Sequence, residues 1–268
     1  MVYDSHYDVA TTVTRLSEAL RSAGGSVVST PEPASFSRTP GEPLPVTDVV
    51  VGGTPMADAA LVTARQQAAI NLPQKYLVRA GSDNQVEVAY NSAGYLAAVS
   101  GADLAASASL GELSARVVSS ATGSTRPAAI GGQPSGTTEN YLKSVPTDVD
   151  INTTVSRLCD AAARQKLPWP TVLTVPAAGG PAGPAATTVV LVQNPPVTTQ
   201  LVRSNPWTAI DLPPRFLVWQ DSRGQTMLSY PNVDVLAARY RLPATSAPVN
   251  ALRDWFSSLA GTAAGAHD

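Results

Sequence analysis

The sequence repeats itself, and the repeat restricts the fold more than any other feature. Residues 209–230 read "AIDLPPRFLVWQDSRGQTMLSY", and residues 69–90 read "AINLPQKYLVRAGSDNQVEVAY". At a shift of 140, residues 186–238 align without gaps on residues 46–98, and 18 of the 53 pairs are identical. Residues 150–161 also pair with residues 8–19 at a shift of 142. An ordered match of this length identifies a tandem duplicate, so one fold must form twice.

Composition sets the boundaries of the two copies. The segment between them is rich in Ser, Thr, Gly and Pro and has almost no large apolar side chain, which is typical of a linker. We therefore expect a first copy at 1–120, a linker at 121–140, a second copy at 141–263 and a tail at 264–268. Apolar residues make up 44% of the chain and charged residues 14%, so each copy has enough apolar side chains for a core.

The local patterns predict the same order of elements in each copy, β-α-β-β-α-β-β-α-α. In the first copy, the β-branched run "VTDVVVGG" (46–53) indicates a buried strand and "ADAALVTARQQAA" (57–69) a helix. "KYLVRA" and "VEVAY" flank "GSDNQ" as a hairpin. The predicted fold class is α+β, with two tandem two-layer α/β sandwich domains, each with helices on one face of a mostly antiparallel or mixed sheet. We expect the copies to pack as a pseudo-two-fold dimer within a monomeric chain.

The repeated residues resemble the domain of unknown function 302 family. The second copy carries the closer match, at Asn194-Pro195, Gln200-Leu201, Ala209 to Pro213, Leu217 to Asp221 and Ser229-Tyr230. The first copy matches at Gly53 to Pro55, Ala69 to Pro73, Leu77-Val78 and Tyr90-Asn91. Single-copy members look like homodimers of a small α+β sandwich, so the resemblance implies a dimer fused into one chain.

This chain departs from the family pattern at one informative place. Family members often carry an Asp-His-Ala-type segment after the second strand, but the corresponding residues 29–47 and 174–188 contain no histidine. Any catalytic or metal-binding role that the resemblance implies for that histidine is therefore weakened here.

Charge and hydropathy exclude several classes of partner. A net charge of −2 and a pI near 5.7 argue against nucleic-acid binding, which needs clustered Lys and Arg. No apolar run is long enough for a membrane span. The N-terminus has no charged n-region followed by an apolar h-region, which favours a cytoplasmic location. A mature secreted protein with a new initiating Met would look the same, so the compartment stays open.

Few residues are suited to catalysis or to metal binding. The histidines are His6 and His267, the single cysteine is Cys159, and no HExxH, CxxC, GxSxG or GxGxxG spacing occurs. We therefore expect no metal site, no cofactor and no identifiable catalytic residue.

The candidate ligand-binding residues come mainly from the second copy, which holds all four tryptophans. An asymmetric apolar pocket lined by Trp207 and Trp219 is one interpretation, and drift after duplication is the simpler one. Tyr90 and Tyr230 occupy equivalent positions in the two copies, and we expect each to be a half-buried ring. We expect Asp211 to be a turn or helix-cap residue. The residues assigned to a candidate site are Asn194, Trp207, Asp211, Trp219, Asp221, Tyr230 and Tyr90.

Three functions remain open. The first is a non-catalytic module that binds a small apolar ligand or a protein partner. The alternative is a hydrolase or isomerase that uses carboxylate and tyrosine groups in a cleft between the copies, which predicts a pocket containing Asp211 or Asp221 beside Tyr230. The third is a structural role in a larger assembly, which predicts an exposed tryptophan patch.

Overall fold

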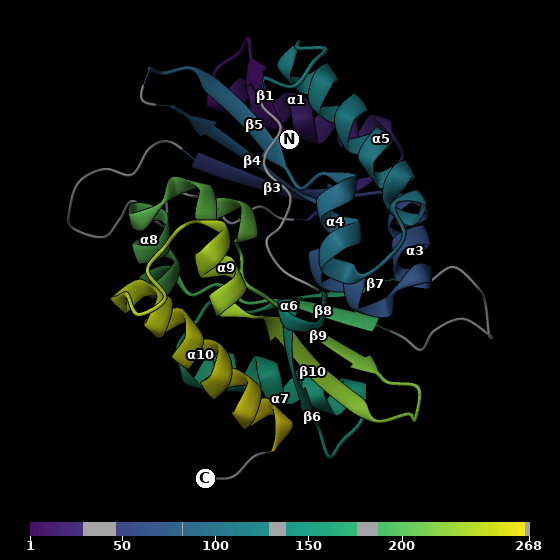
Figure 1. The fold of residues 1–268 in the computed structure, drawn as a ribbon, viewed down its shortest axis with the longest axis vertical. Helices are drawn as coiled ribbons and strands as arrows, with labels where there is room; N and C mark the ends of the chain where they lie inside the picture. Colours follow the sequence, from purple (N-terminus) through teal and green to yellow (C-terminus); the bar gives the residue numbers. More distant parts are fainter. Residues whose placement is uncertain (29–46, 82, 129–137, 176–186, 266–268) are drawn as a thin grey trace.

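The computed structural model of the chain describes residues 1–28, 47–81, 83–128, 138–175 and 187–265 (Figure 1). Residues 29–47 and 174–188, where the family histidine is missing, lie mostly outside this part. Among the described residues, no helix has both the length and the apolar character that crossing a membrane requires.

The first copy has the predicted order of elements. It runs through β1 (Val2–Ser5), α1 (Val9–Ser22), β2 (Ser26–Val28), β3 (Thr47–Gly53), α3 (Pro55–Ala64), the 3-10 helix η1 (Gln66–Asn71), β4 (Lys75–Ala80), β5 (Val86–Tyr90), α4 (Ala93–Ser100) and α5 (Leu104–Thr122). The β-α-β-β-α-β-β-α-α order is therefore confirmed, with the short 3-10 helix η1 added after α3.

The second copy repeats these elements after a short helix, α6 (Thr138–Tyr141). It contains β6 (Leu142–Pro146), α7 (Ile151–Arg164), β7 (Thr171–Val175), β8 (Thr187–Leu191), α8 (Pro195–Ser204), η3 (Pro206–Asp211), β9 (Arg215–Gln220), β10 (Thr226–Pro231), α9 (Val233–Arg239) and α10 (Ala247–Ala264). The bounds of α8, η3 and β9 are those of α3, η1 and β4 plus 140. The helix caps are also repeated, since Asp8 caps α1 and Asp150 caps α7 through the same hydrogen bond to the backbone N–H three residues on.

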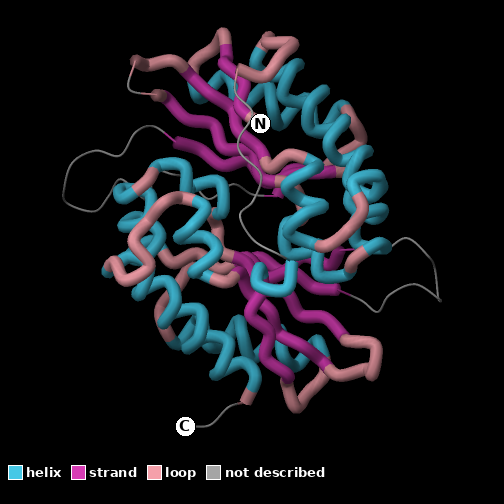
Figure 2. The backbone as a smooth tube through the Cα atoms, in the orientation of Figure 1, coloured by secondary structure: helices cyan, strands magenta, loops and turns pink. Residues whose placement is uncertain are grey.

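Each copy forms one five-stranded sheet, and the predicted α+β class is confirmed. The strand orders are β1-β5-β4-β3-β2 and β6-β10-β9-β8-β7. Every strand pairing among the described residues is antiparallel. Helices α1 and α5 cover one sheet and α7 and α10 cover the other, at opposite ends of the molecule (Figures 1 and 2).

The central strands are buried on both faces, which explains their nearly continuous apolar sequence. On β8 and β9, Val190 and Phe216 belong to the core beneath α7 and α10, whereas Val189 and Leu217 belong to the core shared with the first copy. Successive side chains along each of these strands thus pack into two different cores, one on each face of the sheet.

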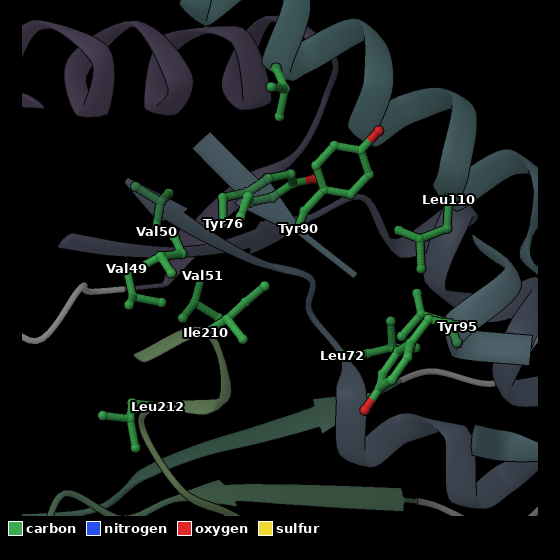
Figure 3. Close-up of a cluster of buried hydrophobic side chains, with 14 of the residues drawn as sticks. Val49, Val50, Val51, Leu72, Tyr76, Tyr90, Tyr95, Leu110, Ile210 and Leu212 are labelled. Carbon is green, nitrogen blue, oxygen red and sulfur yellow. The ribbon is translucent and has the colours of Figure 1, made fainter. Parts of the chain in front are cut away.

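The two copies pack reciprocally, as a pseudo-two-fold pair requires. Segment η1 contacts β8 and β9, and segment η3 contacts β3 and β4. Ile210, in η3, lies beside Val49 and Val51 of the first sheet (Figure 3). The contact between the copies is therefore a continuous apolar core. The equivalent segments η1 and η3, one from each copy, close it.

Candidate functional site

The structure places Tyr90 and Tyr230, which occupy equivalent positions in the two copies, in the cores. Tyr90 is 3% exposed and stacks on Tyr3, with ring centroids 6.1 Å apart. Tyr230 is 8% exposed and stacks on Phe256 at 5.1 Å. Both rings therefore lie within the packing of their own copies.

The four tryptophans lie in different surroundings. Trp219 donates its indole N–H to Ser229 Oγ at 2.9 Å, and Trp207 lies under the Arg79 guanidinium, 4.0 Å from its ring centroid. The Arg79–Trp207 contact joins the two copies. Trp255 is buried in the second core, and Trp169 is 71% exposed, so it is the tryptophan available to an outside partner.

Asn194 and Asp221 hold local backbone. The Asn194 side chain caps α8 by accepting from the Val197 N–H at 3.4 Å. The Asp221 carboxylate accepts from the N–H groups of Arg223 and Gln225, both at 2.9 Å, in the turn between β9 and β10. Asn194 is therefore a helix-cap residue, and Asp221 is a turn residue.

Asp211, by contrast, lines a cavity at the boundary between the copies, which we call the interface cavity. Its volume is about 40 Å3. Helices α8, α9 and α10 supply an apolar wall, with Leu201, Leu236, Leu252 and Phe256. The first copy closes it with the end of η1 and the start of β4, so side chains of both copies meet at its polar end: Asn71, Lys75, Tyr141, Asp211, Arg215 and Tyr240.

Lys75 is the most unusual of these groups. Its side chain lines the cavity, the residue is 5% exposed, and the ammonium group hydrogen-bonds to none of the described residues. Burial, followed by the positive charge of Arg215, holds the pKa of Lys75 well below its ordinary value. The site therefore contains a buried amine without a hydrogen bond to any described residue.

Arg215 occupies the position equivalent to Lys75 in the second copy and reaches across the interface. Its Nη1 and Nη2 donate to the backbone carbonyls of Ile70 at 3.3 Å and Pro73 at 2.8 Å. Its Nε is buried without a hydrogen-bond partner among the described residues. Burial lowers the pKa of Arg215 to about 10. The Nε–H of this fully buried guanidinium is thus available to another acceptor.

The Asp211 carboxylate is held by two neighbours on the second copy. Tyr240 Oη donates to Asp211 Oδ2, and Arg239 Nη1 lies 3.3 Å from the same oxygen. Burial and then the Asp211 charge hold the pKa of Tyr240 well above its ordinary value. Burial disfavours the positive charge of Arg239, but the attraction of the Asp211 carboxylate and the other nearby groups together is larger. The pKa of Arg239 is therefore raised.

Arg239 also bonds to the first copy. Its Nη1 donates to Tyr95 Oη and its Nη2 to Asn91 Oδ1, each at 2.7 Å. The guanidinium lies 4.1 Å from the Tyr95 ring centroid, and the Tyr95 hydroxyl points toward the second copy (Figure 3). Beside this contact, Tyr141 Oη donates to Asn71 Oδ1 at 2.9 Å. The polar end of the cavity is therefore built by both copies.

Positive charge exceeds negative charge around the cavity. Lys75, Arg215 and Arg239 approach it, whereas Asp211 is the carboxylate that lines it. The nearby Asp58, on α3, is buried, and burial raises its pKa to about 7 although Arg215 opposes this rise. The site therefore favours a ligand with a negative charge.

Comparison with known proteins places the chain in a family. The family model described as "Domain of unknown function DUF302" matches residues 1–119 and again residues 143–257. The chain belongs to the DUF302 family. Its two DUF302 domains confirm the resemblance seen in the sequence and the duplication. No curated protein matches this DUF302 chain.

A solved structure titled "Crystal structure of uncharacterized conserved protein DUF302 from Bacillus stearothermophilus" is similar to this DUF302 chain at 17% identity. The match covers 47% of this chain and 97% of that one, with a TM-score of 0.39. Neither this title nor the family description names an activity. Among the described residues, no three His, Cys, Asp or Glu side chains gather as a metal site would require.

Sequence reasoning identified Asp211 but missed Lys75, Arg215, Arg239 and Tyr240. A signal for the first two was present, because both copies place a cation two residues after Leu-Pro and directly before an apolar strand, in "LPQKYLV" and "LPPRFLV". A charge at the start of a strand with two buried faces must itself be buried, which marks it as a candidate for function.

Proposed function

We propose that this DUF302 protein is a small-ligand-binding module whose interface cavity accepts a small carboxylate with a short apolar tail. The observation that carries the proposal is the pair of buried cationic side chains, Lys75 and Arg215, with unused hydrogen-bond donors at one end of an apolar cavity.

Two buried cations without a bonded anion are costly, because neither ammonium nor guanidinium is well solvated away from water. A carboxylate between them offsets this cost and forms charge-assisted hydrogen bonds to Lys75 Nζ and Arg215 Nε. A neutral alcohol or a cationic amine of the same size offers no such gain.

The rest of the cavity sets the size and polarity of the ligand. A volume of about 40 Å3 is room for about three water molecules at roughly 10–15 Å3 each. This suits a ligand of the size of acetate or propionate. Leu236, Leu252 and Phe256 would then contact its alkyl end.

The test is titration calorimetry and thermal unfolding with propionate, and with propanol and propylamine as ligands of matched shape. At about 100 times its dissociation constant, propionate should add about 2.7 kcal/mol to the unfolding free energy. Lys75→Met keeps the apolar stem but removes the ammonium group, and should weaken propionate binding about 10- to 100-fold. The exposed Lys166 supplies the control, Lys166→Met. Equal responses to all three ligands, or equal affinities for the two variants, would contradict the proposal.

One observation supports a second function, an isomerase in which a carboxylate and a tyrosine move protons. Asp211 and Tyr240 share a hydrogen bond at the cavity wall, which is the pairing that proton abstraction next to a carbonyl needs. Proton NMR in deuterated water measures this directly, as exchange of the hydrogens next to the carboxylate of added propionate or pyruvate. Exchange that Asp211→Asn abolishes supports the enzyme, and exchange at the buffer rate excludes it for these ligands.

A further inference from the structure

Lys75 differs from the other lysines in ways that bear on its reactivity. Lys143 and Lys166 are exposed, where water stabilises the ammonium form. Lys75 is 5% exposed and lines the interface cavity, and its side chain forms no hydrogen bond or ion pair with the described residues. A lysine in an apolar site next to another cation is the usual setting for a nucleophilic amine.

Two cations surround this amine. Arg215 and Arg239 both disfavour a positive charge on Lys75, and burial acts in the same direction. Asp211 opposes them, but its carboxylate already accepts from Tyr240 and faces Arg239. Each unit by which a lysine pKa falls raises the neutral, nucleophilic fraction near neutral pH about tenfold.

Arg215 supplies the second part of the site, because it lines the same cavity as Lys75 and Asp211 and its Nε has no hydrogen-bond partner among the described residues. A carboxylate bound beside both groups is attracted to the permanent charge of Arg215 even when Lys75 is neutral, and the neutral Lys75 nitrogen is then available to react. In a 2-oxo acid the carbon next to the carboxylate is a ketone or aldehyde carbon, which is the atom that a free amine attacks.

We infer that the interface cavity takes a small 2-oxo acid and that Lys75 binds it covalently as an imine, an inference that rests on the proposed carboxylate site. The nitrogen lone pair of Lys75 forms the C–N bond, while the carbonyl π electrons move to oxygen. That oxygen takes up the proton that the nitrogen loses. Water then leaves as the C=N bond forms, so the step needs no oxidant or reductant.

The other polar groups of the cavity suit this step. Proton transfer between nitrogen and oxygen needs a relay, and the hydroxyls of Tyr141 and Tyr240 and the carboxylate of Asp211 line the same space. Asp211 also provides the counter-charge for a protonated imine, whose positive charge lies next to Arg215.

The experiment uses the full chain, pyruvate and sodium borohydride, which reduces an imine to a stable secondary amine. Intact mass spectrometry should show a mass increase equal to pyruvate less one oxygen atom. Peptide mapping should place it on Lys75, at least about tenfold above the exposed Lys143 and Lys166. Propionate, which has no carbonyl, should compete and reduce the adduct. Lys75→Met should remove it, with Lys166→Met as the control.

Mapping in the unaltered chain does not depend on whether a variant folds. An adduct spread evenly over the lysines, or confined to the N-terminal amine, overturns the inference. If pyruvate and propionate both stabilise the protein but borohydride traps nothing on Lys75, the carboxylate site stands and the imine is wrong. If neither acid stabilises the protein and no adduct forms, both proposals fail.

Discussion

Arg239 bonds to side chains of both copies, so its removal should weaken the contact between them. It donates to Tyr95 and Asn91 of the first copy, each at 2.7 Å, and faces Asp211 at 3.3 Å. Removing one partner of a buried ion pair typically costs about 3–5 kcal/mol, because the other charge is left unpaired. The Arg239 and Asp211 side chains are 23% and 14% exposed, so water offsets part of that cost. We therefore expect Arg239→Ala to lower the unfolding free energy by about 3 kcal/mol.

Arg253 provides a matched control on the surface. It lies 2.6 Å from Asp234, but the two side chains are 34% and 58% exposed, so Arg253→Ala should cost under about 1 kcal/mol. Urea unfolding followed by circular dichroism measures both variants. Adding Asp211→Asn to Arg239→Ala should recover part of the loss, because it removes the unpaired carboxylate. If Arg239→Ala costs no more than Arg253→Ala, the charge network does not hold the copies together.

Two further predictions concern buried positions. Because burial raises the pKa of Asp58 from 3.8 to about 7, the folded chain keeps a proton that the unfolded chain has released, so stability falls as pH rises through this range. The fall should be up to about 4 kcal/mol, and Asp58→Asn should remove it in a urea series across pH; an unchanged slope would contradict the assignment. Gly111→Ala would place a Cβ 2.9 Å from the Ala93 Cβ, whereas Gly261→Ala meets nothing within 4 Å. In thermal unfolding, the first should destabilise by about 1–3 kcal/mol and the second stabilise by about 0.5–1 kcal/mol; the reverse order would contradict the packing.

Much of the fold follows from local patterns in the sequence. The duplication and the order of helices and strands depend on periodicity and turn residues, which neighbouring residues determine. The strand order β1-β5-β4-β3-β2 depends on pairing between distant segments and was not predicted. Runs such as "DVVVGG" and "RFLVW" also hide which side chain faces which core, because both faces are buried.

The site was harder to predict because its residues are ordinary in their local setting. Arg239 ends α9, where a basic residue is common, and Tyr240 is the C-cap residue that follows it. Lys75 begins β4 in an otherwise apolar strand. Their common function depends on how the second copy packs on the first. Asp211 could be named as a candidate, because carboxylates are among the few groups in this chain suited to proton transfer, but its partners could not.

The central claim is that Lys75 is a buried amine with a lowered pKa that lies beside the bound anion. NMR of protein labelled at its lysine side chains tests this claim most directly. The chain has Lys75, Lys143 and Lys166, so their signals can be assigned by substitution and followed across pH. We predict that Lys75 titrates well below the ordinary range of a lysine and that propionate raises its pKa, because a bound anion stabilises the ammonium form. A Lys75 pKa in the ordinary range of a lysine, or a Lys75 signal that propionate leaves unchanged, would contradict the account.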